Sequence, residues 1–269
     1  MLKIREGRLS REVRESLASY QADVDGQSTY AARVDRAKQQ FSRRNRLDNP
    51  VFVAVKSKLA RMCNGSRRCM YCEDSVADEV EHFHPKDLYP EFVFVWRNYL
   101  YACGPCNGPK NNQFGVVGPT ADEIVVVTRQ RNSPVVPPIA GSTALINPLR
   151  ENPLDFFMLD IRNTFEFTPI SESGTIDRLR ADYTLKVLRL NERDYLIDAR
   201  RNAYSGFLAR LEQYVQHLRN GASPRKLALL RSGIQRSPHP TVWEEMKRQH
   251  LYHSTLSDLF AQAPETLEF

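Results

Sequence analysis

Two cysteine pairs constrain this chain more than any other feature of its sequence. Cys69 and Cys72 form one Cys-x2-Cys pair, and after 30 intervening residues Cys103 and Cys106 form a second. Two thiolates from each pair can complete a tetrahedral S4 site, which Zn²⁺ favours. Such a site has no open position, so we expect a structural zinc ion that contributes about 10 kcal/mol to folding this segment. Cys63 lies outside the spacing, and we expect it to be a buried or partly buried free thiol.

Composition places the chain among globular proteins outside the membrane. Apolar residues make up 41% of the 269 residues and charged residues 26%, and no apolar run approaches the roughly 20 residues that span a bilayer. The first residues mix charged and isolated apolar side chains, which is unlike a signal peptide. We therefore expect a cytoplasmic protein, in which reduced and clustered thiols bind metal more often than they pair as disulfides.

Positive charge is concentrated at the amino-terminal end. The whole chain carries a net charge of +6, whereas residues 1–62 hold 14 Lys and Arg against 7 Asp and Glu. Arg43, Arg44 and Arg46 are bunched together there. This basic arm either contacts a polyphosphate backbone or forms a solvated helical face, and the sequence leaves both readings open.

Hydrophobic periodicity predicts an α+β protein that is mostly helical. Residues 155–168 contain two short apolar runs separated by Asp160 to Asn163, which indicates a hairpin. The apolar stripes on the helices are interpreted as core packing. Trp96, in the cysteine-rich segment, is interpreted as a core anchor rather than as a platform on which a base stacks. Two helices are expected before the cysteines, at 29–44 and beginning at Asn49-Pro50. After them we expect a short helix at 182–190 and a long one that Asn191 caps, with Tyr195 on its inner face, which ends at Arg219 before Gly221. Ser223-Pro224 opens the next helix, and a capping box of Thr241 and Glu244 opens the last.

Four segments are expected along the chain. They are a basic helical region at 1–62, a zinc-bearing core at 63–118, a Pro-, Gly- and Ser-containing linker at 119–145 and a mainly helical region at 146–269.

The 30-residue loop between the cysteine pairs carries the candidate chemistry. It contains Glu81-His-Phe-His-Pro-Lys86 and later Trp96-Arg-Asn-Tyr-Leu100, and the second cysteine pair continues as Cys-Gly-Pro-Cys106-Asn107-Gly-Pro-Lys110. Adjacent residues of an ideal strand point to opposite faces. Glu81 and His82 can therefore share one ligand only at a strand end or a bulge, and the sequence does not decide between these geometries.

The run EHFHPK, then WRNYL, then CGPCNGPK resembles the zinc-bearing HNH, or ββα-metal, endonucleases. That pattern covers about one fifth of the chain. Further stretches, CMYCED, LINPLRENPLDFF at 145–157 and LRLNERDYLIDAR at 188–200, resemble the HNH nuclease subunits that accompany an ATPase in Septu-type anti-phage defence systems. The resemblance implies a DNA-cleaving effector with an ATPase partner.

Residue roles follow from that resemblance. His82 matches the general base that activates water, and Asn98 matches the residue that holds the histidine-bearing loop. Glu81 and Asn107 match the two protein ligands of a catalytic Mg²⁺ or Mn²⁺ ion, and the four paired cysteines match the zinc ligands. Many relatives have aspartate in place of Glu81 and histidine in place of Asn107, but both residues here still offer an oxygen to a hard cation.

Several polar residues nearby have open roles. Lys86 and Lys110 are candidates for contacts with phosphate. His84 either faces phosphate or metal, or packs without a chemical role. The competing function is a zinc-stapled module that binds nucleic acid or protein without cutting it. Glu81, His82 and Asn107 favour the nuclease, because a binding module has no need of an acid, a base and an amide together.

Overall fold

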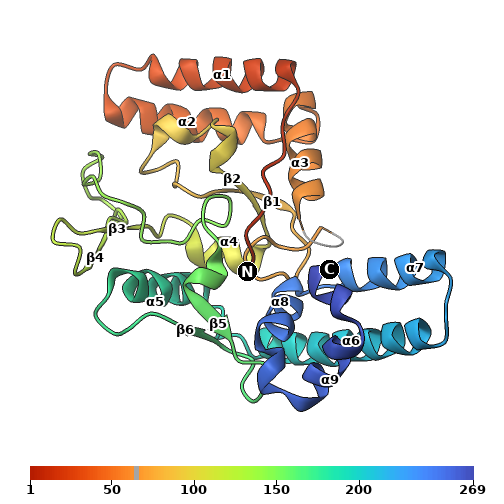
Figure 1. The fold of residues 1–269 in the computed structure, drawn as a ribbon. Helices are drawn as coiled ribbons and strands as arrows, with labels where there is room; N and C mark the ends of the chain where they lie inside the picture. Colours follow the sequence, from red (N-terminus) through yellow and green to blue (C-terminus); the bar gives the residue numbers. More distant parts are fainter. Residues whose placement is uncertain (64–66) are drawn as a thin grey trace.

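The computed structural model describes residues 1–63 and 67–269 and confirms the α+β, mostly helical class (Figure 1). Residues 64–66, inside the predicted 63–118 core, lie outside the described residues. In the described part of the chain, no helix combines the length and the apolar character that a bilayer crossing requires.

Three helices form the amino-terminal layer, and each begins at a side-chain cap. They are α1 (Arg11–Asp25), α2 (Tyr30–Arg44) and α3 (Pro50–Met62). The caps are Ser10, Thr29 and Asn49, whose side-chain oxygens accept hydrogen bonds from backbone N–H groups of the first turn. The predictions of α2 and α3 are confirmed. Helix α1 was not predicted, because its buried apolar residues, Leu17 and Val24, are too few among charged residues to form a clear helical pattern.

Within residues 1–63 and 67–269, the strands form three separate antiparallel pairs. These pairs are β1 (Glu79–His82) with β2 (Tyr99–Ala102), β3 (Gly115–Val117) with β4 (Ile124–Val126), and β5 (Phe157–Leu159) with β6 (Phe167–Pro169). The last pair confirms the predicted hairpin. Helix α4 (Gly104–Lys110) directly follows β2, so β1, β2 and α4 lie in ββα order along the chain. Short 3-10 turns connect these elements at Pro90–Phe92, Trp96–Asn98 and Pro153–Asp155.

The segment expected as a linker contains regular structure. Strand β4 lies within residues 119–145, and Thr143 forms an isolated bridge with Val116. One apolar cluster includes residues from the amino-terminal helices, the cysteine-rich segment and the carboxyl-terminal helices, and Val125 and Val127 pack against it. The division into four segments stays a prediction.

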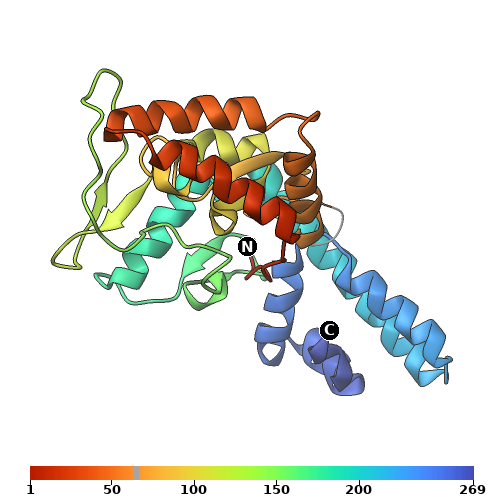
Figure 2. The same ribbon diagram turned by 90° about the horizontal axis from the view of Figure 1, so that it is seen from above.

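Five helices make up most of the carboxyl-terminal part. They are α5 (Ile176–Leu188), α6 (Asp194–Arg219), α7 (Pro224–Gln235), α8 (Pro240–Gln249) and α9 (Ser254–Gln262), with 3-10 turns at His250–Tyr252 and Pro264–Glu268. Helices α6 and α7 lie side by side and project from the body (Figures 1 and 2). Gly221, at φ +65°, follows the end of α6 as predicted, and Ser223 caps α7.

Three predicted helix details are wrong. Helix α5 starts at Ile176 rather than Asp182, because Thr175 caps it. Asn191 does not cap α6. Its side-chain oxygen accepts from the Phe167 N–H and its amide donates to the Phe167 carbonyl, the pair of hydrogen bonds that a neighbouring strand would make with Phe167. Tyr195, expected on the inner face of α6, is 49% exposed.

The predicted capping box at Thr241 is also wrong, and the actual contact connects distant parts of the chain. Helix α8 begins after His239, and Glu244 pairs with Lys247. Thr241 donates from its backbone N–H (3.0 Å) and its hydroxyl (2.8 Å) to the buried carboxylate of Glu73. Glu73 follows Cys72, so α8 is tied to the first cysteine pair.

We expect Thr241→Val to lower the free energy of unfolding by about 1–3 kcal/mol, because a buried carboxylate loses a hydroxyl partner. Urea unfolding followed by circular dichroism measures this change. Thr168→Val, at an exposed position of β6, is the matched control and should change stability by less than about 0.5 kcal/mol. Equal effects of the two changes would contradict the proposed importance of the Glu73 contact.

Candidate metal centre and active site

The four paired cysteines converge as predicted. Their sulfur atoms all lie within 4.8 Å of one another, and all four residues are buried. Cys72 Sγ and Cys103 Sγ are 3.8 Å apart, and a tetrahedral zinc site with Zn–S bonds of about 2.3 Å requires S–S separations of about 3.8 Å. The donor set and its spacing therefore fit a structural zinc ion.

Groups that donate hydrogen bonds surround the sulfurs. The backbone N–H of Tyr71 donates to Cys69 Sγ (3.4 Å), and the Arg193 guanidinium donates to Cys106 Sγ (3.3 Å). Four thiolates around one Zn²⁺ would leave a net negative charge, which the guanidinium of Arg193 would offset. No local pattern pointed to Arg193, because it lies 87 residues from Cys106.

Cys63 lies apart from the cluster. It is buried, and its thiol donates to the Leu59 carbonyl at 3.4 Å. Burial raises the pKa of Cys63 to about 12. It is a protonated free thiol, as the spacing predicted.

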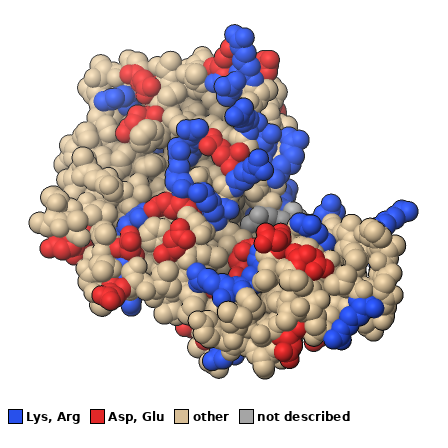
Figure 3. Space-filling view, in the orientation of Figure 1, with Lys and Arg blue, Asp and Glu red and all other residues tan. Residues whose placement is uncertain are grey.

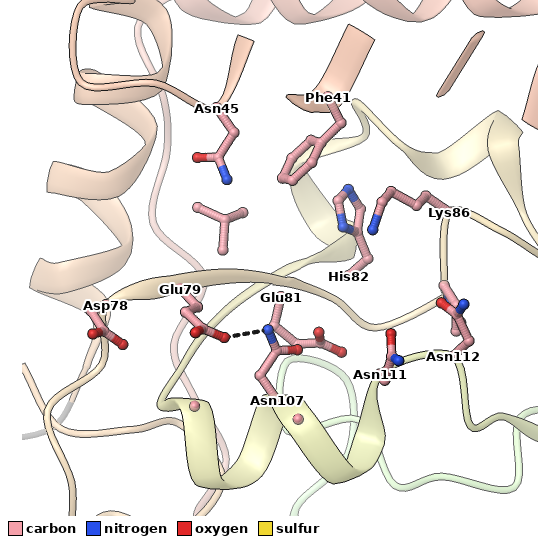
Figure 4. Close-up of a pocket in the computed structure, with 14 residues that line it drawn as sticks. Phe41, Asn45, Asp78, Glu79, Glu81, His82, Lys86, Asn107, Asn111 and Asn112 are labelled. Carbon is pink, nitrogen blue, oxygen red and sulfur yellow. Dashed lines mark hydrogen bonds between the residues drawn. The ribbon is translucent and has the colours of Figure 1, made fainter. Parts of the chain in front are cut away.

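Residues predicted for the catalytic site line one cavity of about 400 Å³ beside α4 (Figure 4). Glu81, His82, Lys86 and Asn107 all line it. Glu81 and His82 alternate along β1, so their side chains lie on opposite sides of the strand in Figure 4, yet both line the cavity. Asn98 and Lys110 are not among the residues that line this cavity.

The imidazole of His82 has a defined orientation. It is buried, with Phe41 and Tyr99 packed edge-on at centroid distances of 4.3 and 5.3 Å. Its Nε2 lies 3.0 Å from the Val93 carbonyl, which can only accept, so Nε2 carries the proton and Nδ1 keeps a lone pair. Burial, together with the positive charge of Lys86, lowers the pKa of His82 to about 3. The ring is therefore neutral near pH 7.

Lys110 is fully buried, which differs from the exposed position that a phosphate contact needs. Its ammonium forms an ion pair with Glu81 and donates to the His82 carbonyl at 2.7 Å. Burial raises the pKa of Glu81 and lowers that of Lys110, while each charge opposes the shift of the other. Lys110 thus ties the end of α4 to the two residues of β1 that line the cavity.

Asn98 fixes the backbone that follows β1. Its side-chain oxygen accepts from the His84 N–H (2.7 Å), and its amide donates to the carbonyls of His84 and Phe92, both at 3.0 Å. His84 itself packs against Phe83, Phe92 and other aromatic rings, away from the residues that line the cavity. Burial lowers the pKa of His84 to about 4. The packing interpretation of His84 therefore fits this geometry.

Sequence patterns did not single out several residues of the cavity. Phe41 and Asn45 reach it from the end of α2, and Asn111 and Asn112 follow α4. Glu79 accepts a hydrogen bond from the Asn107 amide at 2.5 Å. Its position two residues before Glu81 on the same strand was the available signal, since such residues share a face.

Comparison with known proteins gives one partial similarity. Over 83 residues the chain is 42% identical to the Septu protein PtuB of Bacillus thuringiensis. This match covers 28% of the present chain and 32% of that protein, so about a third of the relative is spanned. No family model matches the chain, and no solved structure matches it.

We expect Cys103→Ser to abolish zinc binding and to unfold the segment around the cluster, because three sulfurs hold the ion far less tightly than four. Zinc content by mass spectrometry and thermal melting by circular dichroism measure both effects. Cys63→Ala should retain about one zinc ion per chain, as the cluster of four predicts. A wild-type protein that takes up no zinc on refolding would rule out this centre.

Proposed function

We propose that this protein is a metal-dependent HNH endonuclease that hydrolyses phosphodiester bonds, with DNA as the favoured substrate. The observation that carries the proposal is the convergence of Glu81, His82 and Asn107 on one cavity next to the cysteine cluster. An acid, a base with a free ring nitrogen and a side-chain amide around one cavity are the groups that such hydrolysis needs.

Glu81 and Asn107 would hold the catalytic cation. Carboxylate and amide oxygens suit Mg²⁺ or Mn²⁺, which keep several positions for water and substrate. When bound, the cation neutralises the charge that builds up on the phosphate during displacement. Lys110, already paired with Glu81, opposes the rise in pKa that burial imposes on that carboxyl group.

His82 would act as the general base. Its Nδ1 would accept a proton from water, the water oxygen would attack phosphorus, and the bond from phosphorus to the 3′ oxygen would break, with the departing 3′ oxygen taking a proton from solvent. The products are 5′-phosphate and 3′-hydroxyl ends, as the resemblance to HNH enzymes implies. The hydrogen bond from Nε2 to the Val93 carbonyl stabilises the imidazolium that forms. Lys86, at the edge of the same cavity, would contact phosphate.

The surface charge supports a nucleic acid as the substrate. Phe41 and Asn45 line the cavity from α2, and the neighbouring Arg43 and Arg46 are exposed. Lys and Arg side chains gather over the amino-terminal helices in Figure 3. Such a surface can follow a polyphosphate backbone on either side of the scissile bond.

The similarity to a Septu protein supports a role in anti-phage defence. We propose that the chain is the nuclease effector of such a system and acts with an ATPase partner. The projecting pair α6 and α7 offers surface for that partner (Figure 2). Co-purification with the product of a neighbouring ATP-binding gene tests this assignment, and a stand-alone enzyme would show no such association.

We expect His82→Ala to lower plasmid cleavage in Mg²⁺ or Mn²⁺ by at least about 10²-fold, because the general base is lost. Zinc content should stay at the wild-type level. His217→Ala, on α6 and far from the cavity, is the control. Near-normal cleavage by the His82 variant would remove this residue from the mechanism. EDTA-insensitive binding of DNA without any cleavage would favour the alternative, a zinc-stapled binding module.

We expect the double variant Arg43→Ala and Arg46→Ala to bind duplex DNA more weakly and with a smaller salt dependence. Loss of two phosphate contacts should reduce the slope of log K against log salt by about 2. Fluorescence anisotropy at several salt concentrations measures this slope. Arg219→Ala with Arg225→Ala removes the same charge from the tip of α6 and α7. Equal slopes for the two double variants would show that α2 makes no specific contact.

A further inference from the structure

The amide of Asn107 can face its surroundings in two ways. Its oxygen and its NH₂ group are related by a half-turn about the last side-chain bond, and only the oxygen can bind a cation. The backbone at Asn107 is fixed, because Cys106 belongs to the cysteine cluster and the Asn107 N–H bonds the Cys103 carbonyl at 2.8 Å. The orientation of the amide therefore depends on what its NH₂ group contacts.

Glu79 supplies that contact. Its Oε2 accepts from Asn107 Nδ2 at 2.5 Å, and Figure 4 shows the amide oxygen on the side of Glu81. Glu79 belongs to β1 and pairs with Ala102 of β2, which immediately precedes Cys103. Its carboxylate thus lies against the start of α4, where Gly104 leaves room beside it.

We propose that Glu79 is a positioning residue that selects the cation-binding orientation of the Asn107 amide. A carboxylate has only acceptors, so it draws the NH₂ group toward itself and turns the oxygen into the cavity. With Glu79 removed, the flipped amide becomes accessible and presents its NH₂ group to the cation. The inference rests on the proposed function, because it assigns Asn107 to a divalent cation.

A second role for Glu79 would be direct ligation of the cation, since it also lines the cavity. The two roles differ in what they require. Positioning requires only an acceptor opposite Asn107, which glutamine retains. Direct ligation depends on the negative charge, which glutamine lacks. Positioning also becomes unnecessary if Asn107 is replaced by aspartate, which presents an oxygen in either orientation.

The experiment is a Mn²⁺ titration of the zinc-loaded protein followed by electron paramagnetic resonance, alongside plasmid cleavage as a function of Mn²⁺ concentration. We expect Glu79→Ala to weaken Mn²⁺ binding by about tenfold or more. Cleavage by Glu79→Ala should largely recover at saturating Mn²⁺, so that the variant needs a higher Mn²⁺ concentration but reaches a similar maximal rate. Glu79→Gln should stay within about threefold of wild type, because one acceptor remains. Glu212→Ala, an exposed acid on α6, removes the same charge outside the cavity and should match wild type.

A double-mutant cycle gives the sharper result. In the Asn107→Asp background, Glu79→Ala should no longer weaken Mn²⁺ binding. The inference is overturned if Glu79→Ala binds Mn²⁺ like wild type, if Glu79→Gln falls as far as Glu79→Ala, or if the loss persists in the Asn107→Asp background. A wild-type protein that neither binds Mn²⁺ nor cleaves would instead overturn the proposed function, and the inference with it.

Discussion

The convergence of four sulfurs is the interaction on which the candidate site depends. It joins the segment after α3 to the start of α4, and so sets the position of α4 beside β1. Asn107 follows Cys106 on that helix, and Lys110 reaches from its last turn to Glu81 and the His82 carbonyl. On this one short helix, Cys106 belongs to the cysteine cluster, Asn107 lines the cavity and Lys110 contacts β1. A seven-residue helix has little stability of its own, so the cluster must supply it.

Burial defines the chemistry at the strand end. Burial among aromatic rings lowers the pKa of His82, and the Val93 carbonyl holds Nε2–H, which leaves Nδ1 as the ring nitrogen that can accept a proton. The buried side chain of Glu81 is paired with Lys110, whose charge opposes the rise in the pKa of Glu81 that burial causes. Uncompensated burial of either charge would be costly, so the two residues stabilise each other. Asn98 contributes differently, because it hydrogen-bonds backbone groups of the loop that follows β1 and does not line the cavity.

The carboxyl-terminal region contacts the surroundings of the cysteine cluster as well as packing on itself. Arg193, just before α6, donates to Cys106, and Thr241 of α8 donates twice to Glu73 beside Cys72. Each cysteine pair therefore has a contact from a region more than 80 residues away in the chain. A partner that moved α6 or α8 would act on the surroundings of the sulfurs through these two contacts.

The sequence by itself determined the cysteine set, the α+β class, helices α2 and α3 and the hairpin of β5 and β6. These features depend on spacing, capping and periodicity, which are local properties of a chain. It also singled out Glu81, His82 and Asn107, although only the structure brings them to one cavity. Tertiary structure alone decided the partners of those residues. The contacts of Lys110 with Glu81, Glu79 with Asn107, and Thr241 with Glu73 join elements that are distant in the chain, where no periodic pattern constrains the pairing. The same reason explains the errors at Asn191 and Thr241, whose side chains could cap a helix locally but find stronger partners across the fold.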